Sequence, residues 1–171
     1  VRSTAVVGAG LVGLGWAIVF ARAGLPVTIF DADESVRSGA KARLRASLVD
    51  MESAGLIGDP EGILARCTVL HNLTDAVSNA DYVQESVFER VDVKIAISQA
   101  IGLLLKSGAV VGSSSSGILA SAFTETAPNR QRFLIAHPVN PPQLIPLVEL
   151  VPAPWTDSNI VPELRRFMEK I

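Results

Sequence analysis

A glycine-rich segment near the start of the chain has the spacing that nucleotide phosphates require. Gly8, Gly10 and Gly13 form the pattern G-x-G-x-x-G directly after a short apolar run. The first glycine allows a tight turn, the second lets the backbone approach a pyrophosphate, and the third lets a helix pack closely on a strand. A helix that starts with Leu11 and Val12 would then present free N–H groups and the positive end of its dipole to the phosphates.

An acidic residue follows this motif at the distance expected for ribose recognition. Asp31 lies 21 residues after Gly10, at the end of the β-branched run Val27–Phe30. A carboxylate there can accept hydrogen bonds from the hydroxyls of an adenosine ribose and would repel a 2′-phosphate. No arginine follows directly, since the next residues are Ala32-Asp33-Glu34. The pattern predicts NAD rather than NADP as the cofactor; the alternative is a structural turn in which Asp31 caps a helix.

One of the two histidines stands where a catalytic base could act. His137 follows the apolar run Phe133–Ala136, at the carboxyl end of an expected strand, where open α/β sheets bind ligands. A histidine there can titrate near neutral pH and serve as a general base, or it can simply pair with a loop carbonyl. His71 lies in a polar loop and is interpreted as a surface residue.

The elements that must position these residues alternate between strands and helices. The predicted strands are Ala5–Val7, Val27–Phe30, Thr68–Leu70, Tyr82–Gln84, Ala109–Val111, Phe133–Ala136 and Leu147–Leu150. The predicted helices include Leu11–Ala23, Glu34–Ala54, Val91–Leu105 and a last helix that starts at Ser158 and is still unfinished at Ile171. This order predicts an α/β fold of Rossmann type, with a doubly wound, mostly parallel sheet and helices on both faces.

Composition limits the classes of protein that fit. The chain has 171 residues, of which 49% are hydrophobic, so it can bury a real core and is not intrinsically disordered. A net charge of -2 argues against nucleic-acid binding, and no apolar run is long enough to span a membrane. Cys67 is the only cysteine, which excludes an intrachain disulfide framework and a cysteine-rich zinc site, and we expect no metal. We expect a cytoplasmic protein that binds a small molecule.

Mean hydropathy is +0.37, high for a soluble domain. Either a parallel sheet is covered on both faces, or some apolar surface is covered by a partner.

Taken together, the motifs resemble the 3-hydroxyacyl-CoA dehydrogenase superfamily over essentially the whole chain. The sequence looks closest to the L-gulonate 3-dehydrogenase and lambda-crystallin branch, with carnitine dehydrogenases nearby. The segments that carry the resemblance are Gly8–Gly13 with Trp16-Ala17, Gln84-Glu85-Ser86, the serine run Ser113–Ser116, His137–Pro142 and Pro146–Pro152.

The resemblance implies an oxidoreductase site with named roles. His137 would take the hydroxyl proton of a secondary alcohol as hydride leaves for the nicotinamide, and Glu149 would orient and stabilise its imidazole. Ser116 would bind the substrate oxygen, although it could equally cap a helix that begins near Ile118. Asn140 would face the substrate and the nicotinamide.

The resemblance also concerns NAD binding, and several differences from the hydroxyacyl-CoA branch concern the substrate. Glu89 and Lys94 match family positions that contact NAD. Unlike the hydroxyacyl-CoA branch, the chain has Pro138-Val139 after the histidine, where that branch has phenylalanines, and serines in place of an asparagine and a threonine in the serine run. The helix that carries Lys41, Arg43 and Arg45 lacks a clear lysine cluster for CoA phosphates and reads as a solvated face.

These departures favour a small 3-hydroxy acid resembling L-gulonate. A 3-hydroxyacyl-CoA or carnitine remains an alternative substrate. A non-catalytic crystallin-like protein and an NAD-sensing module are alternatives of another class.

Family members also carry a C-terminal helical domain, which dimerises and closes the substrate cleft. The resemblance therefore assigns residues 1–155 to an NAD-binding domain and 156–171 to the start of a connecting helix. It implies a homodimer formed through that second domain. We expect cofactor binding in this chain alone, whereas catalysis and substrate selection can depend on the helical domain. Part of the high hydropathy is predicted to be surface that this domain covers.

Overall fold

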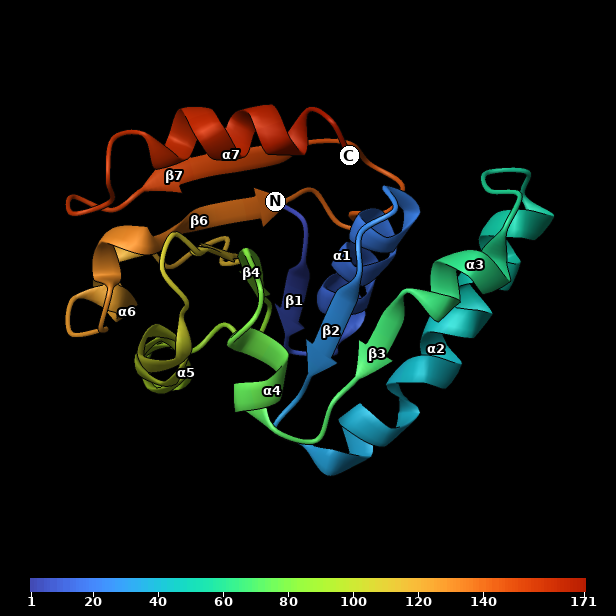
Figure 1. Ribbon diagram of the computed structural model, residues 1–171, viewed down its shortest axis with the longest axis horizontal. Coiled ribbons are helices and arrows are strands. Elements are labelled where there is room, and N and C mark those ends of the chain that lie inside the picture. The colour runs from blue at the N-terminus through green and yellow to red at the C-terminus, as the bar shows by residue number, and fades with distance from the viewer.

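A seven-stranded sheet forms the centre of the computed structural model, which describes residues 1–171 (Figure 1). Its strands are β1 (Thr4–Val7), β2 (Val27–Phe30), β3 (Cys67–Val69), β4 (Tyr82–Glu85), β5 (Val110–Ser113), β6 (Phe133–Pro138) and β7 (Val148–Pro152). They lie in the order β3-β2-β1-β4-β5-β6-β7, parallel except for β7, which runs antiparallel to β6. The order reverses between β1 and β4, and ligands bind at this point in open α/β sheets.

Helices cover both faces of the sheet. They are α1 (Leu11–Arg22), α2 (Glu34–Ser53), α3 (Pro60–Ala65), α4 (Leu73–Val77), α5 (Val91–Leu104), α6 (Ser121–Thr124) and α7 (Ile160–Met168), with a 3-10 turn at Arg130–Arg132. One core cluster joins α1, α2, α3 and α7 to side chains such as Val6 and Tyr82. A second joins α4 and α5 to their strand neighbours, such as Val7 and Val83. Figure 1 shows α4, α5 and α6 together on this second side.

The two core clusters explain why the strands are continuously apolar. Successive residues of a strand point to opposite faces, so a sheet with helices on both faces needs apolar residues at consecutive positions. All four residues of β1 and of β4 are buried. The predicted fold class is therefore confirmed, and all seven predicted strands are present within two residues of their expected bounds.

The last helix differs from the prediction. We expected it from Ser158 through Ile171, whereas α7 begins at Ile160 and ends at Met168. Beyond its end, the amide of Lys170 donates to the carbonyl of Phe167, three residues back, so the chain tightens into a turn.

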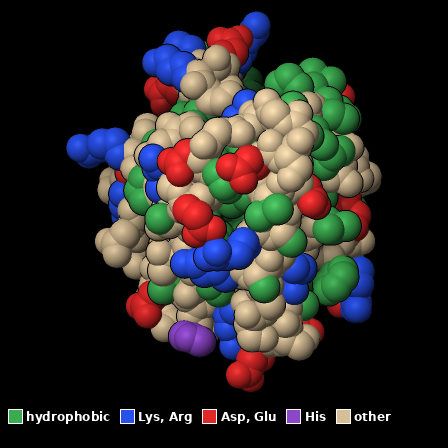
Figure 2. Space-filling model, turned by 90° about the vertical axis from the view of Figure 1, so that its right-hand side faces the viewer, with side chains coloured by type: hydrophobic (Ala, Val, Ile, Leu, Met, Phe, Trp, Pro, Cys, Tyr) green, Lys and Arg blue, Asp and Glu red, His purple; other side chains and the backbone are tan.

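The surface over α2 and α3 is polar and of mixed charge. Lys41, Arg43 and Arg45 are exposed, as predicted for a solvated helix face. Figure 2 shows basic and acidic side chains interspersed over this side of the molecule. None of the helices combines the length and the hydropathy that crossing a bilayer requires.

Candidate active site

The glycine turn has the geometry predicted for each of its three glycines. Gly8 has a φ of +100°, and a Cβ there would lie 2.5 Å from the carbonyl oxygen of Ser86. A Cβ on Gly13 would lie 1.8 Å from the Gly8 carbonyl oxygen, so only glycine permits this close packing of α1 on the turn. Nothing lies within 4 Å of the Cβ position of Gly10, so the backbone there faces open space.

The start of α1 offers hydrogen-bond donors without partners in the protein. The amide of Leu14 donates to the Gly10 carbonyl, whereas the amides of Leu11, Val12 and Gly13 donate to no acceptor in the chain. No side chain caps the helix, and its first turn contains no acidic residue. The free donors and the positive dipole end fit the pyrophosphate of a dinucleotide.

Asp31 stands at the carboxyl end of β2 and faces the same turn. Its Oδ2 accepts a hydrogen bond from the amide of Ala9 at 2.7 Å, and its Oδ1 accepts one from the amide of Asp33 at 2.9 Å. Because a carboxylate has about four acceptor sites, both oxygens retain capacity for ribose hydroxyls. The alternative in which Asp31 caps a helix is wrong. Asp33 caps α2 instead, accepting from the amides of Ser35 and Val36.

Two arginines near this acid were not found from the sequence. Arg37 donates to the main-chain carbonyl of Asp31 at 2.7 Å. Arg43 donates to the carbonyl of Ala9 at 3.3 Å. Both come from α2, so no arginine directly after Asp31 was needed to bring positive charge to the end of β2. No spacing in the sequence indicated them, because residues six apart do not share one face of a helix.

His137 and Glu149 form the predicted pair. The two residues lie directly opposite each other in the antiparallel β6–β7 register. The Nδ1 atom of His137 lies 2.9 Å from Oε2 of Glu149. A carboxylate on this side favours the tautomer with the proton on Nδ1, which leaves Nε2 as a proton acceptor. The imidazole is 28% exposed, so a substrate can reach it.

The serine run begins at the last residue of β5 and lies at the same carboxyl side of the sheet as His137. Ser113, the last residue of β5, pairs with Ile135 in the parallel β5–β6 register. Ser116 therefore follows the carboxyl end of β5, and His137 lies near the carboxyl end of the neighbouring strand β6. Ser116 is exposed, and its hydroxyl makes no hydrogen bond within the chain. That hydroxyl therefore has both its donor and its acceptors free for a substrate oxygen.

Ser115, and not Ser116, binds the amide of Ile118, where we considered that a helix begins, but no helix begins there. Its Oγ accepts from the amide of Ile118 at 3.3 Å and also lies 2.8 Å from the Ile118 carbonyl. The α-helix itself begins only at Ser121. The capping alternative for Ser116 is therefore wrong, because the neighbouring serine occupies the position from which that amide is reached.

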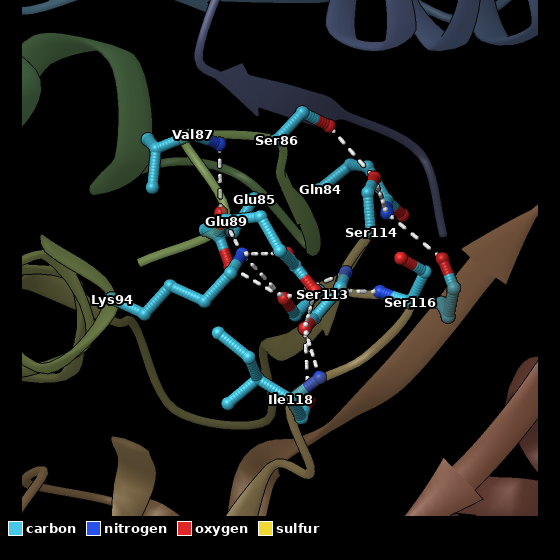
Figure 3. A network of polar contacts seen from close by, with 12 residues as sticks. Gln84, Glu85, Ser86, Val87, Glu89, Lys94, Ser113, Ser114, Ser116 and Ile118 are labelled. Atoms are coloured by element: carbon cyan, nitrogen blue, oxygen red, sulfur yellow. Dashed lines mark hydrogen bonds and ion pairs between the residues drawn. The ribbon is translucent and has the colours of Figure 1, made fainter. Parts of the chain in front are cut away.

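Glu89 and Lys94 belong to a polar network shown in Figure 3. Lys94 is 1% exposed, with its Nζ 3.0 Å from Oε1 of Glu85 and 3.5 Å from Oε2 of Glu89. Partial burial acts to raise the pKa of Glu89, but hydrogen bonds from the Gly117 amide and the Ser115 hydroxyl outweigh it, and the pKa is lowered. Glu89 is thus an ionised acceptor near the surface, and Lys94 lies behind it. A direct contact of Lys94 with NAD stays a prediction.

Asn140 lies in the loop between β6 and β7. It is exposed, and its side chain makes no hydrogen bond within the chain. A contact of this amide with the substrate stays a prediction.

Comparison with known proteins agrees with this geometry. The family model described as "3-hydroxyacyl-CoA dehydrogenase, NAD binding domain" matches residues 3–171. The chain belongs to this family. NAD is therefore its cofactor, in agreement with the free amides of the glycine turn and with Asp31.

Three curated relatives of this family member are similar over nearly its whole length. A 3-hydroxyacyl-CoA dehydrogenase of Gibberella moniliformis is 34% identical, and the match covers 100% of this chain and 52% of the relative. Lambda-crystallin of Oryctolagus cuniculus is 34% identical over 97% of the chain and 53% of its own length. L-carnitine dehydrogenase of Pseudomonas putida is 33% identical over 94% of this chain and 50% of its own length. The chain thus spans about half the length of these relatives.

A solved structure shows the same fold in this family. The M. tuberculosis protein FadB2 superimposes with a TM-score of 0.95 at 32% identity, covering 100% of this chain and 61% of that one.

Proposed function

We propose that this chain forms the cofactor-binding part of an NAD-dependent dehydrogenase that oxidises the 3-hydroxyl of a small 3-hydroxy acid to a ketone. The observation that carries the proposal is the 2.9 Å contact between His137 and Glu149 at the edge of the sheet. A protein that only binds or senses NAD needs no base with an orienting carboxylate.

The chemistry divides between the cofactor and three side chains. NAD, when bound, supplies the acceptor for the hydride that leaves C3 of the substrate. His137 accepts the hydroxyl proton on Nε2, and the carbon–oxygen double bond forms from the electrons of the broken O–H bond. Glu149 stabilises the resulting imidazolium, and Ser116 donates a hydrogen bond to the oxygen.

The substrate class follows from the departures near the base. Pro138 and Val139 follow His137, and the helix α2 offers no lysine cluster for CoA phosphates. We therefore place a small polar acid resembling L-gulonate first. A 3-hydroxyacyl-CoA and L-carnitine are alternative substrates for the same reaction, because two relatives are named as dehydrogenases of these compounds.

The test is NADH formation with L-gulonate, L-carnitine and 3-hydroxybutyryl-CoA. It is performed with this chain and with any longer chain that its gene encodes. Turnover of one 3-hydroxy substrate supports the proposal, and loss of that turnover in His137→Ala assigns the base. His71→Ala is the matched control, since His71 is the other histidine and is exposed. Absence of turnover on all three, together with tight NAD binding, would favour a structural or sensing protein instead.

A further inference from the structure

A buried ion pair, Glu85 with Lys94, lies beneath the serine run, and no proton or hydride transfer of the proposed reaction is assigned to it. Glu85, the last residue of β4, and Lys94, in the first turns of α5, are each 1% exposed. Removing two charges from water costs free energy that their attraction offsets only with good geometry, so such a pair is weak evidence of a stabilising role. Its presence requires another explanation.

The carboxylate of Glu85 is fully engaged inside the protein. It accepts hydrogen bonds from the amide of Val87 at 2.7 Å and from the hydroxyl of Ser113 at 2.5 Å. Lys94 lies about equally near both of its oxygens, at 3.0 and 3.1 Å. The ammonium group is therefore fixed by an anion that is itself held by β4 and β5.

The same ammonium reaches outward to a half-exposed carboxylate. Lys94 lies 3.5 Å from Oε2 of Glu89, whose side chain is 41% exposed. The other oxygen, Oε1, accepts from the amides of Ser116 at 3.0 Å and Gly117 at 2.9 Å and from the hydroxyl of Ser115 at 2.7 Å. One glutamate thus holds three successive residues of the loop, and Figure 3 shows the side chains of Lys94, Glu85 and Glu89 next to one another.

A second buried residue of β4 ties the serine run to the strand that carries the base. Gln84 donates from Nε2 to the hydroxyl of Ser114 at 2.8 Å and to the carbonyl of Ala136, next to His137, at 3.1 Å. Tyr82 donates to Oε1 of Gln84 at 2.5 Å, which fixes the orientation of the amide. Gln84 therefore links the serine run to the backbone of β6, next to His137.

We infer that Lys94 and Glu85 are positioning residues for the serine loop, residues 115–117. Lys94 holds the carboxylate of Glu89, and Glu89 holds the backbone of Ser116, so that its free hydroxyl stays at the sheet edge beside His137. The consequence for turnover rests on the proposed function, whereas the order of the loop does not.

The first test measures loop order directly by amide hydrogen exchange. The variant is the double substitution Lys94→Met with Glu85→Gln, which leaves no lone buried charge. We expect the amides of Ser116 and Gly117 to exchange about tenfold faster, because Glu89, which accepts from both amides, loses the ammonium group that holds it. Protected amides of β1 report that the fold is intact.

A matched control tests whether the loss of a different lysine ion pair also speeds amide exchange at Ser116 and Gly117. Lys106 follows α5 and pairs with Asp81 at 2.6 Å. This pair lies at the amino end of β5, whereas the serine loop follows its carboxyl end. Lys106→Met should leave exchange at Ser116 and Gly117 unchanged. Unchanged exchange at these two amides in the double variant would overturn the inference, whether or not any substrate is turned over.

The second test uses a double-mutant cycle with Glu89→Gln on kcat for the substrate that the wild type oxidises. If Lys94 acts through Glu89, the double substitution Lys94→Met with Glu85→Gln lowers kcat when Glu89 is present. The same double substitution then has little further effect on kcat when Glu89 is already glutamine. The inference would be contradicted if the double substitution and Glu89→Gln lowered kcat by factors that multiply and that parallel the loss of thermal stability. That result would show a merely structural role.

Discussion

In the proposed reaction, the carboxylate of Glu149 selects the His137 tautomer that carries its proton on Nδ1, from which it lies 2.9 Å away. It is 66% exposed, so its contribution comes from its place opposite His137 and not from a low dielectric. We predict that Glu149→Gln keeps the fold and lowers kcat by about 10²–10⁴-fold, the range for impaired general-base catalysis. Steady-state NADH formation measures this effect. A kcat equal to the wild type would show that the imidazole needs no orienting carboxylate.

Asp31 is predicted to decide between the two nicotinamide cofactors. Its carboxylate faces the glycine turn, and Arg37 and Arg43 donate hydrogen bonds to the main-chain carbonyls of Asp31 and Ala9. Asp31→Ser removes the anion that repels a 2′-phosphate and leaves both cations. We expect NAD to bind about tenfold more weakly, for the loss of one or two hydrogen bonds, and NADP to bind more tightly than in the wild type. Calorimetry with both cofactors measures the change, and a wild type that prefers NADP would contradict the role of Asp31.

At the scale of elements, the strands could be predicted because β-branched runs bounded by glycines and helices are distinctive. The short helices α3 and α4 could not, because six and five residues are too few to show a helical period. Their starts were nevertheless marked by the caps Asp59 and Asn72.

The same limit applied to parts of the site. In a run of four serines, nothing in the sequence separates Ser115, which binds the amide of Ile118, from the exposed Ser116. Arg37 and Arg43 meet main-chain carbonyls of other elements, and only the packing of α2 on the sheet creates those contacts. By contrast, His137 directly follows one predicted strand and Glu149 lies in another, and the family resemblance already implied that the two residues form a pair.

An ion pair between Asp81 and Lys106 connects the residues before β1 and β4 to the segment that follows the end of α5. Asp81 accepts hydrogen bonds from the amides of Arg2 and Ser3 and pairs with Lys106. The hydrogen bond from Lys106, followed by those from the two amides, lowers the pKa of Asp81 to about 2, although partial burial opposes them.

We predict that Asp81→Asn lowers the free energy of unfolding at neutral pH by ~1–2 kcal/mol. Because the folded pKa lies below the unfolded value, this stability is present above about pH 4 and is lost as pH falls toward about 2. Urea unfolding from pH 7 downward should show the difference between Asp81→Asn and wild type shrinking only in the acidic range. A difference that is constant with pH would assign the effect to packing.

At the scale of the whole molecule, two covered sheet faces account for much of the high hydropathy. Apolar surface remains at the loop between β6 and β7, where Leu144, Ile145 and Leu147 are 51%, 37% and 55% exposed. They border a groove of about 940 Å³ between α1, β7 and α7.

We predict that this groove is covered by a C-terminal helical domain in a longer chain, which also forms the dimer. Hydrogen exchange should then show protection of the loop's amides only in the longer chain. A second domain that never contacts this groove, seen by exchange or by solution scattering, would contradict the prediction.

In the proposed reaction, hydride passes from C3 of a hydroxy acid to NAD beside His137. The most direct measurement follows deuterium from a substrate labelled at C3, with the reduced cofactor analysed by mass spectrometry. We predict that the reduced nicotinamide carries the deuterium in the wild type and that His137→Ala forms it at least about a hundredfold more slowly. Unlabelled reduced cofactor, or labelled cofactor formed equally fast without His137, would contradict the claim.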